Sequence, residues 1–429
     1  MQTVHLFSEK TSQRLHYIGK TLLTEALGFS IQLHLREDTF QQADGIKINY
    51  SAHKLEGSIQ IIPHTLLFDH GIHDYPISVL SHPVYHKIFM ASGGKEVPFD
   101  LFAAAFWLLS RYEEHLPHKG DIYNRFNYRS SLAYQNNFLT IPLINLWLEQ
   151  FKKVLSTQQP DVVFKKHSYT FLSTIDIDNA YQYKYKGFVR TVAGMVSDRS
   201  LAKIKERTKI ILGLKPDPFD CYDFLLDTHR THGIQALFFI LLGDYGPNDK
   251  NHSASDLRFH KLIKHIKDYA MVGIHPSFGS NKTIHQLQVE VHRLSSITHF
   301  PTSQSRQHFS MLSFPNTYQH LLQAGITADY SMGYTNHNGF RASYCFPFKW
   351  YSLENESITP LLIHSFCLSE NTLLSHTQNR NEMLLEAKLA VDEVKKYHGT
   401  CISIFHNDNF DKDLHQFYTD FVTMAVRAD

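Results

Sequence analysis

Two rhythms of hydrophobic and polar residues follow each other along the chain, and the change comes near residue 168. Before that point, some stretches repeat apolar residues at helical spacing and others alternate apolar and polar residues as strands do. The helical stretches are 14–27, 101–114 and 142–155, and the strand-like stretches are 31–35, 47–50 and 58–62. This mixture predicts a smaller α+β domain over residues 1–155, followed by a polar linker near 156–167. The stretch 101–114 is apolar almost all round, so we expect a buried helix with Asp100 as its N-cap.

From residue 169 onward, strand-like and helix-like stretches alternate. The strand-like ones are 169–178, 234–242, 270–275, 326–330, 361–366 and 400–406, and the helix-like ones are 219–232, 256–268, 283–296, 315–323 and 381–397. Such alternation is typical of a parallel sheet with helical crossovers. Because no glycine-rich phosphate loop follows the first strand, a barrel is favoured over a dinucleotide-binding sheet. We therefore predict an α/β fold, a (β/α) barrel, over residues 168–429.

The first strand of this barrel ends in two carboxylates, Asp176 and Asp178. Residues two apart on a strand point to the same face, so both side chains are expected to project together. Two like charges this close raise the pKa of one of them unless a cation neutralises them. We interpret Asp178 as a metal ligand and Asp176 as a base. The alternative is that Asp178 and Asn179 form a polar turn that caps the next helix.

Other candidate residues stand where later strands end, which is where barrels carry their chemistry. Arg306 is expected to pair with Asp176 and to keep it ionised. His275 and His308 are expected to complete a metal site with Asp178 and to leave open positions for water and substrate. With 29 histidines in the chain, a single histidine is weak evidence, and the convergence of several strand ends carries the argument.

His406, at the end of the last strand, is placed to donate a proton to a leaving group, with a carboxylate such as Asp329 to orient it. Together these residues supply the parts for metal-assisted hydrolysis of an acyl group. The cation would polarise the carbonyl, Asp176 would take a proton from water, and His406 would protonate the departing amine.

Composition excludes several classes of protein. The chain has 429 residues, of which 43% are hydrophobic and 19% are charged, so we expect a globular protein. A net charge of +1 argues against a general nucleic-acid binder. The four cysteines are scattered without a CxxC motif, which signals neither a disulfide framework nor a thiolate zinc site. We see neither a signal peptide nor a membrane-spanning apolar run, so we expect a cytoplasmic location and no transmembrane segment.

A basic insertion at residues 184–215 follows the carboxylate strand. It carries nine Lys and Arg against Asp198 and Glu206, with apolar residues between them. Such a segment suits an anionic saccharide, a nucleotide-sugar phosphate or a lipid phosphate at a membrane surface. The alternative is a solvated amphipathic cover over the rim of the barrel.

These motifs, in this order, resemble those of the polysaccharide deacetylase family, which is carbohydrate esterase family 4 with its nodulation-type chitooligosaccharide deacetylase domain. The stretch Thr174-Ile-Asp-Ile-Asp178 is similar to the first motif of that family, and Gly273-Ile-His275 to the start of its histidine motif. Arg306 matches the arginine of the third motif, and Ser403-Ile-Phe-His406 matches the closing motif. Residues 99–114 and 339–348 resemble those of a two-domain bacterial branch.

The resemblance implies a distorted (β/α) barrel of about seven strands, a divalent metal that is usually Zn²⁺, and removal of acetyl groups from an N-acetylated saccharide. The saccharide could be anionic or lipid-linked. Arg341 and Tyr334 are the expected substrate-binding residues, although Arg341 suits a structural ion pair equally well. The chain departs from the family at Gly279, where the histidine motif has its second histidine. His308 is our proposed substitute, and His285 is a weaker one.

Two alternatives remain open at this point. One is a metal-independent hydrolase of another C–N bond on the same barrel, which the altered histidine motif permits. The other is a non-catalytic saccharide-binding protein that has kept the barrel. The grouping of Asp176, Asp178, Arg306 and His406 weighs against the second, because charged groups are costly to bring together without a use.

Overall fold

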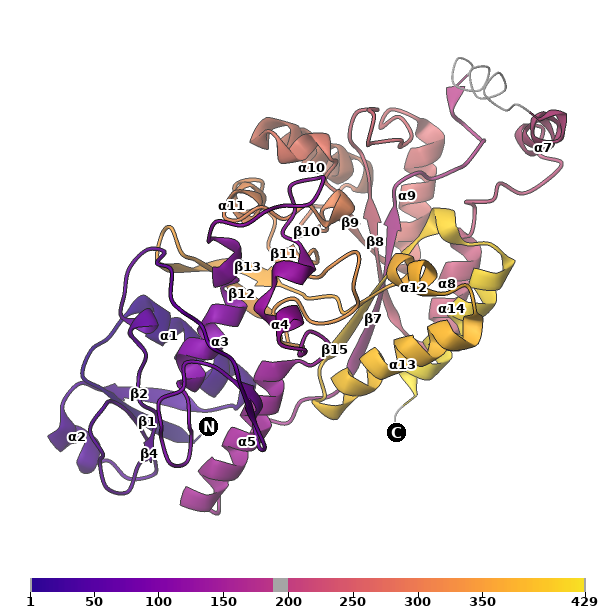
Figure 1. The fold of residues 1–429 in the computed structure, drawn as a ribbon. Helices are drawn as coiled ribbons and strands as arrows, with labels where there is room; N and C mark the ends of the chain where they lie inside the picture. Colours follow the sequence, from indigo (N-terminus) through magenta and orange to yellow (C-terminus); the bar gives the residue numbers. More distant parts are fainter. Residues whose placement is uncertain (1, 188–199, 428–429) are drawn as a thin grey trace. The chain divides into compact units, whose positions relative to one another are not determined.

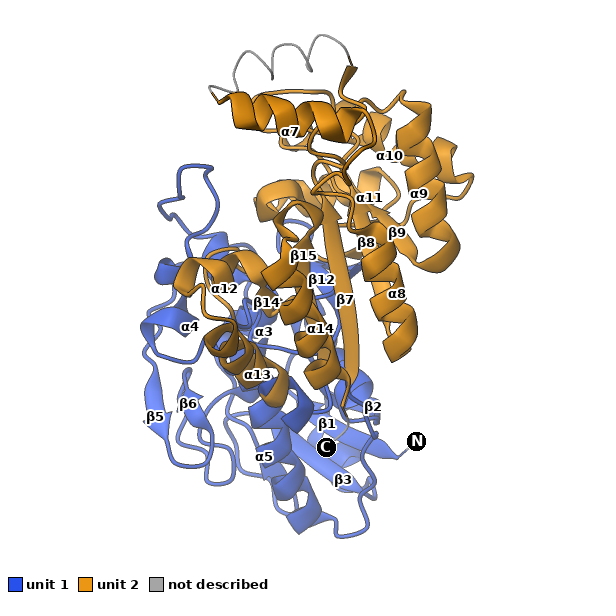
Figure 2. Cartoon of the chain, turned by 90° about the vertical axis from the view of Figure 1, so that its right-hand side faces the viewer, with its two compact units in different colours: residues 1–169, 339–365, 393–399 blue, residues 170–338, 366–392, 400–429 orange. Residues whose placement is uncertain are grey.

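The computed structural model describes residues 2–187 and 200–427, and the chain divides into two compact units (Figure 2). Unit 1 contains residues 1–169, 339–365 and 393–399, and unit 2 contains the remainder. Two late segments of the chain therefore fold with the N-terminal residues, whereas the sequence pattern predicts continuous domains over 1–155 and 168–429. Of the predicted basic insertion, residues 188–199 lie outside the described part of the chain.

Unit 1 is built on a parallel sheet whose strand order is β2-β1-β3-β4. Strand β1 pairs with β2 and with β3, and β3 pairs with β4. The bounds are β1 Thr3–Ser8, β2 Ser30–His34, β3 Ile46–Tyr50 and β4 Ile59–Gln60. Two short antiparallel pairs complete its strands, namely β5 Leu80–His82 with β6 His86–Ile88 and β12 Phe348–Ser352 with β13 Ser357–Ile363.

The helices of unit 1 form where apolar residues repeat at helical spacing in the sequence. They are α1 Gln13–Gly19, continued by a π-helix over Lys20–Ala26, α2 Glu37–Gln41, α3 Leu101–Leu109, α4 Leu132–Gln135 and α5 Leu143–Gln158. All nine residues of α3 are buried, and the Asp100 side chain accepts a hydrogen bond from the Ala103 backbone N–H, as an N-cap does. The helix is shorter than predicted because Arg111 adopts a left-handed backbone conformation, with φ of 54°, which α-helices do not continue through.

Unit 2 holds a distorted, incomplete (β/α) barrel of seven parallel strands, which confirms the predicted fold class (Figure 1). The strand order within this unit is β11-β10-β9-β8-β7-β15-β14. The bounds are β7 Thr170–Ile177, β8 Gln235–Ile240, β9 Met271–Ile274, β10 Gln304–Ser305, β11 Ala328–Asp329, β14 Leu368–Ser369 and β15 Thr400–His406. The helices that connect or flank them are α7 Leu201–Ile211, α8 Tyr222–His232, α9 Leu257–Tyr269, α10 Ile284–Thr298, α11 Asn316–Gln323, α12 Glu370–His376, α13 Arg380–Lys396 and α14 Lys412–Val426.

One predicted barrel strand pairs differently from the others. Residues 361–366 were expected to alternate with helices as the other strands do, but residues 357–363 form β13, which pairs antiparallel with β12 in unit 1. Alternation of apolar and polar residues marks a strand with one buried face and does not fix the direction of its partner. The short β14 lies parallel to β15 in unit 2.

The core of the barrel is apolar and leaves the polar residues at the strand ends. It is formed by Leu172, Leu237, Phe239, Tyr330, Phe366, Ile402 and Ile404. Because parallel strands end at the same edge of a sheet, the residues that follow these core positions are gathered at one rim. No helix within the described residues is long and apolar enough to span a membrane.

Candidate metal and catalytic site

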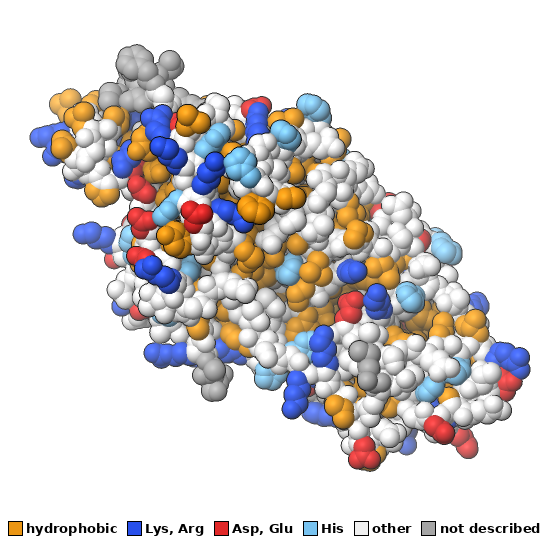
Figure 3. All heavy atoms as spheres, turned by 180° about the vertical axis from the view of Figure 1, so that it is seen from behind, with side chains coloured by type: hydrophobic (Ala, Val, Ile, Leu, Met, Phe, Trp, Pro, Cys, Tyr) orange, Lys and Arg blue, Asp and Glu red, His pale blue; other side chains and the backbone are white. Residues whose placement is uncertain are grey.

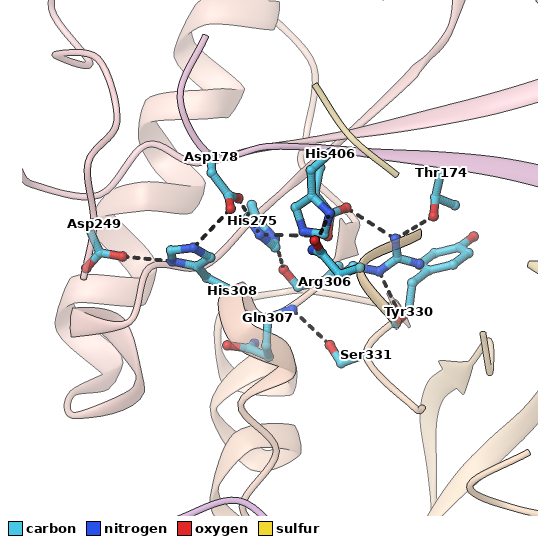
Figure 4. Close-up of polar contacts among 12 residues, drawn as sticks. Thr174, Asp178, Asp249, His275, Arg306, Gln307, His308, Tyr330, Ser331 and His406 are labelled. Atoms are coloured by element: carbon cyan, nitrogen blue, oxygen red, sulfur yellow. Dashed lines mark hydrogen bonds and ion pairs between the residues drawn. The ribbon is translucent and has the colours of Figure 1, made fainter. Parts of the chain in front are cut away.

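The register of the parallel strands brings the predicted residues together at one rim of the barrel. Asp176 on β7 is directly opposite His406 on β15, and Ser305 on β10 is opposite Ile274 on β9. Arg306 and His275, one residue further along each strand, therefore lie beside each other. Figure 4 shows the side chains of Asp178, His275, Arg306 and His406 close together.

Asp178, His275 and His308 form the group of described residues that is arranged to hold a metal ion. One ligand atom from each lies within 4.8 Å of the others. The Nε2 of His275 is 3.1 Å from Oδ1 of Asp178, and the Nε2 of His308 is 3.3 Å from Oδ2. Both histidines are buried, whereas the Asp178 side chain is 25% exposed, so the group opens to solvent on the aspartate side.

The hydrogen bonds of His275 fix which of its ring nitrogens carries the proton. Its Nδ1 lies 2.6 Å from the backbone carbonyl oxygen of Arg306, which can only accept, so Nδ1 donates and Nε2 presents a lone pair. Neither this Nε2 nor Oδ1 of Asp178 has a hydrogen-bond partner within the described residues. The His275 nitrogen and the Asp178 oxygen are both common metal ligands, and they face each other at 3.1 Å, so the donor set fits a divalent cation.

His308 is oriented by Asp249, a residue that the sequence motifs did not identify. The Nδ1 of His308 lies 3.0 Å from Oδ1 of Asp249. That carboxylate also accepts hydrogen bonds from the backbone N–H groups of Phe278, at 2.9 Å, and Gly279, at 3.2 Å. Because Asp249 holds the proton of His308 on Nδ1, the Nε2 of His308 is left to face Asp178.

A proton and a cation compete for the position between His308 and Asp178. Burial alone would lower the pKa of His308, but the charge of Asp178 and the hydrogen bonds to Asp178 and Asp249 raise it to about 9. Burial alone would also raise the pKa of Asp178, but His308 and His275 hold it well below its usual range. Metal binding at this group therefore releases protons and strengthens as the pH rises.

The sequence departs from the family motif at Gly279. This glycine has no side chain to offer a metal, and its backbone N–H donates a hydrogen bond to Asp249. A Cβ at this position would lie 2.7 Å from Nε2 of Gln286, so the space is already filled. The third member of the metal group comes from the neighbouring strand end, at His308. His285, the weaker substitute, lies on α10 and is not part of the group.

Asp176 is held by the buried Arg306, as expected. Nη1 of Arg306 lies 3.2 Å from Oδ1 of Asp176 and also donates to the hydroxyl of Thr174, while its Nε donates to the Tyr330 carbonyl oxygen at 3.0 Å. The guanidinium is fully buried against the ring of Phe239, 4.7 Å from its centroid. Arg306 thus places a buried guanidinium beside the carboxylate of Asp176, as the sequence predicts.

His406 is oriented by Glu370, a second residue without a sequence motif. The Nδ1 of His406 lies 2.6 Å from Oε1 of Glu370, which also accepts the backbone N–H of His406 at 2.7 Å. The other ring nitrogen, Nε2, lies 3.9 Å from Oδ2 of Asp176. Burial opposes the charged form of His406, but Glu370 and then the carboxylates of Asp178 and Asp176 raise its pKa well above the usual value.

Asp329, which we expected to orient His406, has other partners. Its carboxylate accepts hydrogen bonds from the hydroxyls of Ser305, at 2.8 Å, and Ser331, at 2.9 Å, and from the Ser331 backbone N–H. Burial raises its pKa, and the nearby charge of Arg306 works in the opposite direction. A catalytic role for Asp329 stays a prediction.

The two predicted substrate-binding residues lie in different units. Tyr334 belongs to unit 2 and is buried. Arg341 belongs to unit 1, where its buried guanidinium pairs with Glu114 through Nε at 2.9 Å and through Nη2. This ion pair is the structural role that the sequence left open as the alternative, and substrate binding by either residue stays a prediction.

Comparisons with known proteins give one family match and a set of distant structural likenesses. Residues 4–160 match a family model described as a family of unknown function, DUF7033. No curated protein matches the chain. Among solved structures, a protein assigned as a polysaccharide deacetylase from Mycobacterium smegmatis is 11% identical with a TM-score of 0.39, over 61% of this chain and 87% of that one.

Two further solved structures belong to the same family. A family 4 carbohydrate esterase from Streptomyces lividans, in complex with acetate, is 10% identical with a TM-score of 0.30, over 60% of this chain and 87% of that one. A CE4 family pseudoenzyme from Bacillus anthracis is 10% identical with a TM-score of 0.31, over 60% of each chain.

Proposed function

We propose that this protein is a metal-dependent hydrolase that removes acetyl groups from N-acetylated saccharides. The observation that carries the proposal is the convergence of His275 and His308 on the carboxylate of Asp178, beside a second carboxylate, Asp176, that pairs with Arg306. A metal group next to a separate base and a separate acid is the arrangement that amide hydrolysis requires. The motif order of the sequence supports the choice of acetylamino sugars.

Each residue has a distinct role in the proposed reaction. Asp178, His275 and His308 would hold the cation, which, when bound, polarises the substrate carbonyl and lowers the pKa of water. Asp176 accepts the proton of the attacking water, and Arg306, which pairs with Asp176, holds this carboxylate in place for the step. His406, with its raised pKa, carries a proton at neutral pH and delivers it to the departing amine.

Several finer features belong to the same proposal. Two imidazoles and one carboxylate are ligands that Zn²⁺ binds readily, so we propose zinc as the metal. The resemblance of the sequence motifs to those of nodulation-type chitooligosaccharide deacetylases favours a bacterial enzyme of saccharide biosynthesis, and a cytoplasmic location stays a prediction. Tyr334 remains the candidate for substrate contact in unit 2.

Two variants of the paired carboxylates test the metal and base assignments separately. Asp178→Ala should lose bound zinc and acetate release together. Asp176→Asn should keep zinc and lower acetate release from chitooligosaccharides by roughly 10²–10⁴-fold, which is the usual contribution of a general base. The measurements are the metal content of the purified protein and the acetate released per unit time.

A matched control is Asp223→Asn, because Asp223 is an exposed carboxylate on α8 in the same unit. It should change neither quantity. Full zinc occupancy in Asp178→Ala would contradict the ligand assignment. Activity that survives exhaustive chelation would identify the metal-independent hydrolase, and saccharide binding without turnover would identify the non-catalytic alternative.

A further inference from the structure

Helix α7 and the residues just after it expose three leucines to solvent. Leu201, at its start, is 86% exposed, and Leu212 and Leu214, just after its end, are 67% and 71% exposed. The buried residues of the helix are Arg207 and Ile210. Single exposed leucines are common on protein surfaces, but three in one short segment indicate a surface that contacts something else.

Lysines are interleaved with these leucines. With 3.6 residues per turn, Leu201, Lys205 and Leu212 fall on one stripe of the helix, and Lys209 lies beside it. Lys215 follows Leu214 and pairs loosely with Glu206, at 3.5 Å. In Figure 3, orange and blue side chains stand side by side over this helix, at the upper left. The α7 surface, as we name it, consists of Leu201, Lys205, Lys209, Leu212, Leu214 and Lys215.

The α7 surface is fixed to the segment of chain that leaves the strand of the candidate site. The carboxylate of Asp217 accepts the backbone N–H groups of Gln182, Tyr183 and Lys184, at 2.7, 2.9 and 3.0 Å. The guanidinium of Arg207 stacks over the ring of Tyr183, 4.6 Å from its centroid. Asp217 and Arg207 thus tie the α7 region to residues 182–184, a few positions after Asp178. The α7 surface is therefore attached to the chain segment that leaves the strand of the proposed metal ligand.

We propose that the α7 surface docks on a lipid bilayer that contains anionic lipids. Leucines that point outward would enter the boundary between headgroups and acyl chains, and lysines beside them would contact lipid phosphates. A second copy of this chain is a poorer occupant. A symmetric dimer places the same patch on both sides of the interface, so it would bring lysine against lysine. The inference does not depend on the proposed enzymatic activity.

The test is co-sedimentation of the full chain with vesicles of two compositions. The protein should bind vesicles of phosphatidylcholine mixed with phosphatidylglycerol, bind pure phosphatidylcholine vesicles weakly, and be released by salt. Lys205→Gln, Lys209→Gln and Lys215→Gln should each lower the partition coefficient about fivefold, which corresponds to about 1 kcal/mol per lysine at an anionic surface. Combining Leu201→Ser, Leu212→Ser and Leu214→Ser should abolish binding.

A matched control replaces two exposed leucines elsewhere in the same unit. Leu385 and Leu389 on α13 are 62% and 66% exposed and have no cluster of lysines between them. Leu385→Ser with Leu389→Ser should leave vesicle binding unchanged. Equal binding of the α7 leucine variant and the native chain, or no binding of the native chain to anionic vesicles, would overturn the proposal. So would an oligomer of the native chain that the α7 leucine variant dissociates.

Discussion

At the scale of single residues, the proton position on His308 is decided by Asp249. An aspartate accepts the Nδ1–H, whereas an asparagine would offer an N–H in the same place and would move the ring proton to Nε2. Asp249→Asn should therefore weaken zinc binding by roughly 10–100-fold, the usual effect of losing an outer-shell partner. Competition titration with a zinc chelator measures the affinity.

The control for this variant comes from the same loop. Asp244 lies five positions before Asp249, and its side chain is exposed and pairs with Arg293 at 2.9 Å. Asp244→Asn should leave zinc affinity unchanged. If Asp249→Asn binds zinc as tightly as the native chain, His308 is not a ligand oriented in this way.

His406 offers a second prediction, which concerns pH. Its pKa is raised well above the usual value, and Glu370 is the main cause that favours the charged ring. A general acid must be protonated, so the rate falls as the pH rises through its pKa. Glu370→Gln should lower that pKa and move the alkaline limb of the kcat/KM profile to lower pH.

Nuclear magnetic resonance titration of His406 gives a readout of the same shift that does not require activity. The ring signals should titrate at lower pH in Glu370→Gln than in the native chain. An unchanged titration of His406 would show that Glu370 does not set its charge.

Asp249 and Glu370 also mark the limit of what the sequence could predict about the site. Functional residues of barrels usually lie at strand ends, so the sequence pattern was enough to select the candidates there. These were Asp176, Asp178, His275, Arg306 and His406. Asp249 lies in the irregular loop after β8, and Glu370 opens the short helix α12. No spacing along the chain links either of them to a histidine, so only the folded structure reveals those pairs.

At the scale of elements, strand β9 has room for glycine alone at position 273. A Cβ there would lie 2.8 Å from the ring of Phe239 and 2.9 Å from the carbonyl oxygen of Gln304. Gly273→Ala should therefore force β9 away from its neighbours and lower the free energy of unfolding by about 1–3 kcal/mol. Because His275 stands two residues further along, zinc affinity should fall as well.

Urea unfolding and zinc titration check both effects. Gly246→Ala is the matched control, because a Cβ at Gly246 approaches nothing closer than the Asp244 carbonyl oxygen at 4.0 Å. It should change neither stability nor zinc affinity. A Gly273→Ala variant with native stability would show that β9 is free to shift.

Most elements were predictable from apolar periodicity, and the misses have physical reasons. The helix predicted over 256–268 forms as α9 at Leu257–Tyr269, capped by Asp256, because the repeat and the cap agree. Residues 361–366 were expected to run parallel to their neighbours because their apolar pattern matches that of the other barrel strands. Their partner β12 is antiparallel, and the pairing partner of a strand is a tertiary property that its own pattern does not contain.

At the scale of the whole molecule, the buried pair of Arg341 and Glu114 joins a late segment of unit 1 to an early one. Burial would raise the pKa of Glu114, but Arg341 and Arg111 lower it to about 2. The carboxylate therefore adds stability above about pH 4.5, and this contribution is lost as the pH falls toward 2. Arg341→Ala should lower the free energy of unfolding by about 3 kcal/mol at neutral pH, the lower end of the range for breaking a buried pair, because Arg111 still pairs with Glu114.

Urea unfolding of the full chain measures this loss of stability. Arg380→Ala is the control, because Arg380 is half exposed and lies 3.7 Å from Asp420, and exposed pairs contribute about 0–1 kcal/mol. A small effect of Arg341→Ala on stability, together with a large effect on substrate affinity, would favour the substrate-binding role instead.

The discontinuous course of unit 1 has a consequence for the growing polypeptide on the ribosome. Residues 1–169 are made first, but the segments that complete their unit end at residue 399. At about 5–20 residues per second, synthesis of the intervening stretch takes roughly 12–46 s. During that time the nine apolar residues of α3 lack part of their final surroundings. We therefore expect the nascent chain to bind a chaperone until the last segment of unit 1 has been synthesised.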